Sequence, residues 1–428
     1  MAVAELSITF FLQMAVILVT CRVVGWLGRK YLKQPQVVCE MIAGVLLGPS
    51  LFGLVAPDVQ KLVFTPPNQG VLYVGAQLGV GLYMFLVGLG FRTDDFKANV
   101  HRAASVSIAG MVVPFAVAIA ATPWLMTVPG LFAPTATRFD ATLFLGAAIA
   151  ITAFPMLARI IHERGLSQTS LGTLSLSAGA IDDAAAWCVL AVVLASFGAA
   201  GTAVAYTAIF GGIAFALFMI FVMPRILGPL ARRFDRDSAA GHSRNGTVFA
   251  LVMALFMLSA YTADRIGLHA VFGGFLLGCV MPRGELADSV RRQLESFTVI
   301  VLLPMFFTYS GLNTQLTLIA DPHLLIVALA VLAMSVLAKF GACWAAARLT
   351  GQDNRTALGI GALMNSRGLM ELIIINIGLQ AGVIGPALFS MLVLMAIVTT
   401  LMASPVFEIV YGRQARRSGE LGAVESSG

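Results

Sequence analysis

Apolar segments about as long as a membrane span recur from one end of the chain to the other. A helix needs about 20 apolar residues to cross a bilayer, whereas a barrel strand alternates over about 10. These segments are long and uniformly apolar, so the pattern predicts an all-α polytopic membrane protein. We place thirteen spans at about 7–27, 36–53, 69–91, 102–123, 141–161, 169–197, 203–226, 246–264, 267–282, 295–312, 323–347, 356–378 and 384–411.

The basic residues test this count, because cytoplasmic loops of membrane proteins are enriched in Lys and Arg. Of the 27 Lys and Arg residues, 21 fall in loops or the tail on one side, three in loops on the other side and three within spans. The alternation predicts a plasma or inner membrane protein with its N-terminus outside and its C-terminus in the cytoplasm. No Lys or Arg precedes the first span and no clear cleavage site follows it, so we expect an uncleaved anchor.

The amino-acid composition agrees with a membrane protein and argues against a soluble or nucleic-acid-binding protein. Hydrophobic residues make up 59% of the 428 residues and charged residues 11%, and the mean hydropathy is +0.90. A soluble chain would be about 25% charged. The net charge of +6 follows from the basic inner loops, so it gives no separate support for nucleic-acid binding. The five cysteines lie in spans without disulfide or metal-binding spacing, and we expect no cofactor.

Two sequence matches indicate an internal repeat. The second span, "AGVLLGPSLFG", matches the ninth, "GGFLLGCVMPR", and this aligns Gly44 and Gly48 with Gly274 and Gly278. The third span, "LYMFLVGL", matches the tenth, "LPMFFTYSGL", at nearly the same shift. The chain then contains six spans, one linking span and six more spans. Because equivalent helices are seven spans apart, the second copy enters the membrane in the opposite orientation. Inverted repeats are a recurring architecture of secondary transporters, whose sites lie at the membrane midplane on interrupted helices.

The fifth span of each repeat carries residues that interrupt a helix. In "AITAFPMLARI" the proline removes a helical hydrogen bond, although a simple kink is an alternative. In the twelfth span, "NSRG" brings an amide, a hydroxyl and a guanidinium into the membrane. Glu371 follows this arginine by four residues, so the two either neutralise each other on one helix face or take part in transport. The interrupting residues are Thr152, Phe154, Pro155, Asn365, Ser366 and Arg367.

Charged residues elsewhere in the spans point to a site. Asp182 and Asp183 are adjacent in the sixth span, where each charge costs roughly 2.5–3.5 kcal/mol on insertion scales. Lys339 has no acid in its own span and needs a carboxylate from another helix, for which this pair is the obvious candidate. Because one lysine cannot neutralise two aspartates, we expect the pair to form a site. Glu40, near the start of the second span, is expected at the membrane interface.

These motifs resemble those of the monovalent cation:proton antiporter-2 family. The resemblance runs from "QPQVVCEMIAGVLLGPSLFG" to "NSRGLMELIIINIGLQAGVI" and includes "ITAFPMLARII", "SAGAIDDAAAW", "GLHAVFGGFLLGCVMPR" and the lysine of "LAKFGACW". It implies that Asp183 is the essential ion-binding and proton-binding carboxylate, that Asp182 pairs with Lys339, and that the fifth and twelfth spans cross beside them. Several relatives have Asn-Asp where this chain has Asp182-Asp183, so the resemblance leaves the charge stoichiometry open.

The resemblance also implies an elevator transporter that forms a homodimer, in which a dimer domain stays still while a core domain carries the ion. The transmembrane antiporter domain is expected to cover residues 1–412, with a short cytosolic tail at 413–428. Many relatives append a cytosolic regulatory domain, so regulation of that kind would here need another subunit. The expected ranges are about 7–91 and 246–312 for the dimer domain, about 102–197 and 323–411 for the core domain, and about 203–226 for the linker helix.

The residues and the resemblance together predict exchange of a monovalent cation for protons. A small dehydrated cation prefers oxygen ligands, such as the carboxylates of Asp182 and Asp183 and the hydroxyl of Thr152. Cation and proton then compete for one site, which is antiport. The Asp-Asp pair with Lys339 favours sodium. A potassium/proton antiporter of the same fold and a sodium-coupled organic anion symporter are the alternatives, and Lys339 argues against the symporter.

Other classes fit the sequence less well. A channel needs a continuous pore with a filter or charged rings. An intramembrane aspartyl protease needs facing aspartates on different helices, whereas adjacent residues on one helix point about 100° apart. A primary pump needs a phosphate-binding loop, and the sequence contains no G-x-x-x-x-G-K-[ST] motif. We therefore expect a secondary transporter and not an enzyme.

Overall fold

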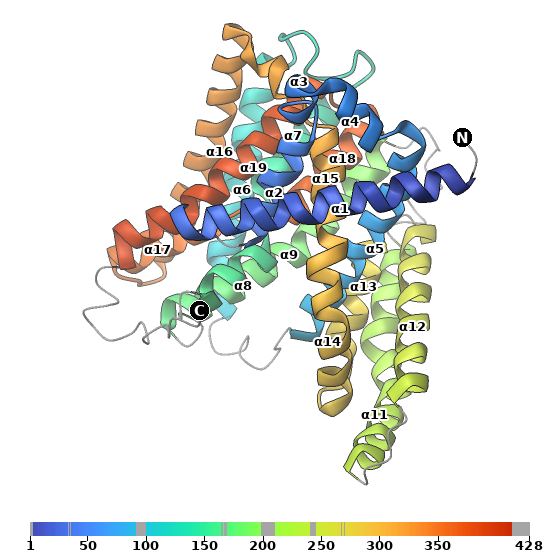
Figure 1. Ribbon diagram of the computed structural model, residues 1–428. Helices are drawn as coiled ribbons and strands as arrows, with labels where there is room; N and C mark the ends of the chain where they lie inside the picture. The colour runs from blue at the N-terminus through green and yellow to red at the C-terminus, as the bar shows by residue number, and fades with distance from the viewer. Residues whose placement is uncertain are drawn as a thin grey trace. The chain divides into compact units, whose positions relative to one another are not determined.

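The described part of the chain is helical, as the sequence predicts (Figure 1). Its one isolated β-bridge joins Phe132 to Ile384. The predicted tail at 413–428 and the predicted start of the linker helix at 203–209 lie outside the described residues. The computed structural model describes residues 3–32, 34, 36–90, 100–163, 166, 169–197, 210–239, 245–266, 268 and 270–412.

The α-helices of the described residues have the following order along the chain. In the first half of the chain they are α1 (Val3–Leu27), α2 (Gln36–Leu47), α3 (Phe52–Val55), α4 (Pro57–Val63), α5 (Pro66–Gly90), α6 (Val100–Leu125), α7 (Arg138–Ala150), α8 (Phe154–Glu163) and α9 (Ser170–Phe197). In the second half they are α11 (Met223–Ala239), α12 (Asn245–Ile266), α13 (Ala270–Val280), α14 (Glu285–Phe297), α15 (Leu303–Leu312), α16 (Pro322–Leu349), α17 (Asn354–Met364), α18 (Leu369–Gln380) and α19 (Pro386–Phe407).

Nine helices in the described part are long and apolar enough to cross a membrane, judged by length and composition. They correspond to nine of the thirteen predicted spans. The other four predicted spans contain α9, the short α13, and the two pairs α7–α8 and α17–α18. Each of these pairs is one predicted span that is broken near its middle. The predicted interruption of the fifth and twelfth spans is therefore confirmed.

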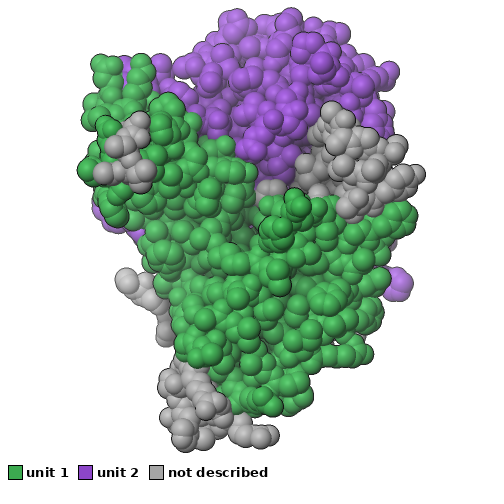
Figure 2. Space-filling view, turned by 90° about the vertical axis from the view of Figure 1, so that its right-hand side faces the viewer, with its two compact units in different colours: residues 1–19, 58–92, 194–309 green, residues 20–57, 93–193, 310–428 purple. Residues whose placement is uncertain are grey.

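The chain divides into two compact units, which Figure 2 shows in different colours. Unit 1 contains residues 1–19, 58–92 and 194–309, and unit 2 contains residues 20–57, 93–193 and 310–428. Both broken helices and every charged residue of the predicted site belong to unit 2. The predicted assignment of helices to a dimer domain and a core domain stays a prediction.

An apolar core in unit 2 holds the helices that carry the site. It is built by side chains from α6, α8, α9, α16, α17 and α19, all with little or no exposure. Close packing of these side chains sets the distances between the helices, and therefore the spacing of the polar residues that the helices carry. Representative members, one from each helix, are Val106, Leu157, Leu174, Ala347, Ile360 and Phe407.

Side-chain caps fix where the helices of the site begin. Thr137 and Asp140 form a reciprocal capping box at the start of α7, and Asp321 accepts from two amides at the start of α16. Asp353 does the same for α17, accepting from the amides of Arg355 and Thr356. Partial burial alone would raise the pKa of Asp353, but hydrogen bonds from the Thr356 hydroxyl and from backbone amides hold the pKa of that carboxyl below its usual range.

The repeated glycines make backbone contacts in both units. In unit 1, a Cβ on Gly278 of α13 would lie 2.9 Å from the Cα of Gly88 and would overlap the carbonyl of Phe85 on α5. In unit 2, a Cβ on Gly48, after α2, would lie 2.9 Å from the carbonyl carbon of Gly311 on α15. Equivalent helices of the two repeats thus exchange partners, as expected for an inverted repeat.

Replacing Gly278 with Ala should destabilise the protein. The new methyl group has to push α13 away from the α5 backbone, and overpacking of this kind costs about 1–3 kcal/mol. Gly341→Ala on α16 is the matched control, since no atom of a neighbouring segment lies within 4 Å of its added carbon. Thermal unfolding of the purified variants in detergent measures the difference, and equal Tm values would contradict the close contact.

Candidate functional site

The two broken helices cross in unit 2, and their breaks are hydrogen-bonded to each other. The backbone amide of Ala153, between α7 and α8, donates to the carbonyl of Ser366, between α17 and α18, at 3.2 Å. The Thr152 hydroxyl oxygen lies 2.9 Å from the carbonyl of Met364, the last residue of α17. Pro155 belongs to the first turn of α8, where a missing N–H leaves no helical bond unmade. The structure therefore brings the predicted interrupting residues together.

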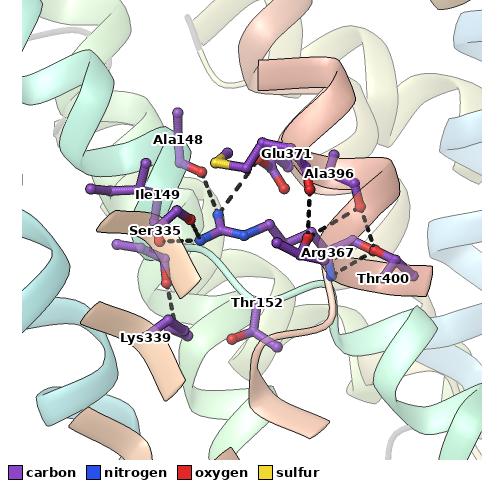
Figure 3. Close-up of polar contacts among 12 residues, drawn as sticks. Ala148, Ile149, Thr152, Ser335, Lys339, Arg367, Glu371, Ala396 and Thr400 are labelled. Carbon is purple, nitrogen blue, oxygen red and sulfur yellow. Dashed lines mark hydrogen bonds and ion pairs between the residues drawn. The ribbon is translucent and has the colours of Figure 1, made fainter. Parts of the chain in front are cut away.

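Cationic side chains satisfy the carbonyls at the end of α7. A helix leaves its last carbonyls without intrahelical partners, and such groups must be paired when they are buried. The guanidinium of Arg367 donates through Nη1 to Ala148 and through Nη2 to Ile149, both at 2.7 Å (Figure 3). The ammonium of Lys339 donates to the carbonyl of Ala150. Positive charges at the negative end of the α7 dipole are also electrostatically favourable.

Arg367 is buried and makes further contacts. Its guanidinium donates to Ser335 on α16, and Nη1 lies 3.5 Å from Oε1 of Glu371, which is fully buried on the next turn (Figure 3). The i,i+4 pairing of Arg367 with Glu371, one of the two alternatives left open by the sequence, is thus present. Glu371 balances the guanidinium charge, while the directional hydrogen bonds go to the α7 carbonyls.

A hydroxyl on α19 holds the backbone of the second break. Thr400 Oγ1 accepts from the amide of Arg367 at 3.1 Å and lies 2.6 Å from the carbonyl of the same residue. The hydroxyl also lies 2.7 Å from the carbonyl of Ala396 on its own helix, so it accepts from the Arg367 amide and shares its hydrogen between two carbonyls. Asn365 and Ser366 in the same break are buried, and their side-chain oxygens have no hydrogen-bond partner among the described residues.

Asp182 on α9 is held by three donors. Its Oδ2 accepts from the ammonium of Lys339 at 2.5 Å and from Thr152 at 2.7 Å, and its Oδ1 accepts from Ser107 on α6 at 2.5 Å. Asp182 and Lys339 are both 0% exposed. The ion pair implied by the family resemblance is therefore present. Its ammonium also donates to the last carbonyl of α7, which links the pair to that helix.

Asp183 has a different environment, although it is the next residue. It is 0% exposed, and neither carboxylate oxygen has a hydrogen-bond partner among the described residues. One turn earlier, Gly179 allows α9 to approach α8, because a Cβ there would lie 2.5 Å from a methyl carbon of Leu157. Burial of an ionised carboxylate without partners is costly, so this group must take a proton or a cation.

Glu40 lies in a separate polar group of unit 2. It is 1% exposed on α2, so it is buried in the protein, and its expected position at the membrane interface stays a prediction. Gln36 donates to its carboxylate at 2.9 Å and also to the carbonyl of Cys21. These contacts tie α2 to α1.

Sequence reasoning missed three hydroxyl residues of the site: Ser107, Ser335 and Thr400. Serine and threonine in membrane helices commonly bond to carbonyls of their own helix, so no pattern separated these from the others. One signal was available for Ser335, because it lies four residues before Lys339 and therefore on the same face of α16.

Comparisons with known proteins match nearly the whole chain. The family model described as "Sodium/hydrogen exchanger, transmembrane" matches residues 15–411. The Na(+)/H(+) antiporter NhaS4 of Synechocystis sp. is 36% identical over 398 residues, which cover 92% of this chain and 95% of that protein. The K(+)/H(+) antiporter 1 of Saccharomyces cerevisiae is 30% identical over 415 residues, and the match covers 94% of this chain and 46% of the yeast protein.

A solved structure has the same fold. The sodium proton antiporter MjNhaP1 from Methanocaldococcus jannaschii superimposes with a TM-score of 0.64, covering 97% of this chain and 98% of that one. Its sequence identity is 16%, so the likeness concerns the fold. The predicted fold class, an all-helical membrane protein of the antiporter type, is confirmed.

Thr400→Val should lower stability more than the same change one residue earlier. Valine keeps the shape but removes the hydroxyl, which leaves the buried amide of Arg367 without this acceptor at a cost of about 1–3 kcal/mol. Thr399 is also buried, and it bonds to carbonyls of its own helix, so Thr399→Val is the matched control. Thermal unfolding in detergent compares the two. Equal losses of stability would show that Thr400 does not support the break.

The Asp182–Lys339 pair should behave as one unit in a double-mutant cycle. Lys339→Gln leaves a buried carboxylate without its cation, and breaking a buried pair from one side typically costs about 3–5 kcal/mol. Adding Asp182→Asn should recover part of that loss, since neither charge is then uncompensated. The melting temperatures of the two single variants and the double variant are the measurement. Additive losses would mean that the two side chains act independently.

Proposed function

This chain belongs to the sodium/hydrogen exchanger transmembrane family and is a monovalent cation/proton antiporter, and we propose that cation and proton compete for the carboxylate of Asp183. The two adjacent aspartates differ in one respect that supports this. Asp182 already accepts from three donors, whereas neither oxygen of Asp183 has a hydrogen-bond partner among the described residues. Of the pair, Asp183 therefore has the oxygens free to exchange one ligand for another.

The chemistry of exchange follows from this difference. With a proton bound, the Asp183 carboxyl is neutral and tolerates burial. When the proton leaves, a dehydrated monovalent cation neutralises the carboxylate, with neighbouring oxygens completing its shell. The Thr152 hydroxyl and the backbone carbonyls of the two breaks are the predicted further ligands. Because the two ligands exclude each other, movement of one is coupled to movement of the other.

Sodium is the proposed cation. The Asp-Asp pair with Lys339 is the basis for that choice, and the relative from Synechocystis is named as a Na(+)/H(+) antiporter. Potassium is the second candidate, because the yeast relative is named as a K(+)/H(+) antiporter. The elevator movement, the homodimer and an inner-membrane location with the N-terminus outside stay predictions from the sequence.

Asp183→Asn should abolish exchange with every cation while the protein still folds. Asparagine keeps the size of the side chain but cannot give up a proton or neutralise a cation. Everted vesicles carrying a pH-sensitive dye, with sodium, lithium or potassium added in turn, measure both the loss and the cation preference of the unmodified protein. Glu285→Gln, at an exposed carboxylate paired with Arg292, is the control for removing an acid.

Two outcomes would change the proposal. Exchange retained in Asp183→Asn at normal apparent affinity would remove Asp183 from the site. A dye response to potassium without one to sodium would replace the proposed cation and leave the carboxylate assignment in place.

A further inference from the structure

Helix α6 contributes a buried hydroxyl to the aspartate pair. Ser107 is 1% exposed, and its Oγ donates to Oδ1 of Asp182 at 2.5 Å. Other hydroxyls on the same helix behave differently, since Ser105 and Thr122 each donate to a carbonyl one turn earlier in α6. That local bond is the usual choice for serine in a helix. Ser107 instead reaches across to α9.

The three donors divide the two oxygens of Asp182 between them. Lys339 and Thr152 share Oδ2, and Ser107 holds Oδ1. The single hydroxyl hydrogen of Thr152 has a second acceptor nearby, the carbonyl of Met364 at 2.9 Å. Ser107 therefore provides the hydrogen bond that occupies Oδ1, and a proton or cation at that oxygen has to displace it.

A glycine one turn further along α6 brings this helix close to the ion pair. A Cβ on Gly110 would lie 3.3 Å from Nζ of Lys339 and 2.7 Å from Sγ of Cys343 on α16. Lys339 of α16 pairs with Asp182, so the close approach of α6 to α16 places Ser107 within reach of the same carboxylate. The hydrogen bond from Ser107 to Asp182 is therefore part of how these helices pack.

Few other ionisable groups surround Asp182 in the part of the chain that the structure describes. Lys339 and the Cys343 thiol face it from α16, and Asp183 follows it on α9. Arg367 and Glu371 lie beside the α7 carbonyls that precede the one bound by Lys339. Ser107 supplies the donor from α6.

We propose that Ser107 is a positioning residue that keeps Oδ1 of Asp182 occupied, so that protons and cations exchange at Asp183 and not at both aspartates. This inference rests on the proposed role of Asp183 and adds the reason why its neighbour does not take part. Ser107 occupies Oδ1 and Lys339 and Thr152 occupy Oδ2, so a proton or cation can bind Asp182 only by displacing one of these donors.

The number of exchanging carboxylates can be read from competition between cation and proton. If one carboxylate takes part, the apparent cation affinity falls by up to about tenfold for each unit of decreasing pH. If two must lose protons before the cation binds, the slope of log apparent affinity against pH rises towards about two. A residue with a merely structural role changes the amount of active protein but leaves this slope unchanged.

The experiment compares this slope in proteoliposomes for the unmodified protein and three variants. Ser107→Ala should raise the slope from about one towards about two. Ser107→Thr keeps the hydroxyl and should restore a slope of about one. Ser105→Ala, which removes an exposed hydroxyl two residues away, is the matched control and should leave the slope unchanged. If Ser107→Ala does not accumulate, Ser107→Cys replaces it, because a thiol is a weaker donor of similar size.

The outcomes separate this inference from the proposed function. An unchanged slope in Ser107→Ala, or in Ser107→Cys when that variant replaces it, would overturn the role of Ser107. A slope already near two in the unmodified protein would do the same, because a second group would then exchange a proton while the hydroxyl is in place. Neither result removes Asp183 from the site. That requires exchange to persist in Asp183→Asn, which is measured separately.

Discussion

The carbonyls at the end of α7 impose the main constraint on the site. They lie inside an apolar bundle where a helix has been broken, and buried carbonyls of this kind must be paired. Arg367 and Lys339 pair them, so two positive charges enter the interior. Each charge then needs a counterion, which Glu371 and Asp182 provide. The charged groups at the crossing thus follow from the interruption of one helix.

The same requirements also give the two aspartates different roles. Asp182 is bound to the structure through Lys339, and through that ammonium to the end of α7. Asp183 shares the same helix and the same burial but not these contacts. A site that must release its ligand benefits from one fixed and one free carboxylate, because the fixed group preserves the geometry while the free group changes its occupant.

The sequence predicted the parts of this arrangement that carry a clear energetic penalty. A lysine without an acid in its own span has to find one elsewhere, and Lys339 does pair with Asp182. Pro155 marked the break correctly, although it lies in the first turn of α8 and does not remove a hydrogen bond from a continuous helix. Ser107 and Thr400 were not predicted, because a hydroxyl can bond to its own helix at little cost and its actual partner depends on tertiary packing.

The glycine contacts between repeats have a consequence for the biogenesis of the protein. Gly48 lies in the second predicted span and contacts the backbone at Gly311, and Gly88 contacts Gly278. The early helices therefore enter the bilayer long before their close-packed partners have been synthesised. Their glycine faces must meanwhile be covered by lipid or by transient neighbours, so the N-terminal repeat cannot complete its packing during translation until the ribosome has passed residue 311.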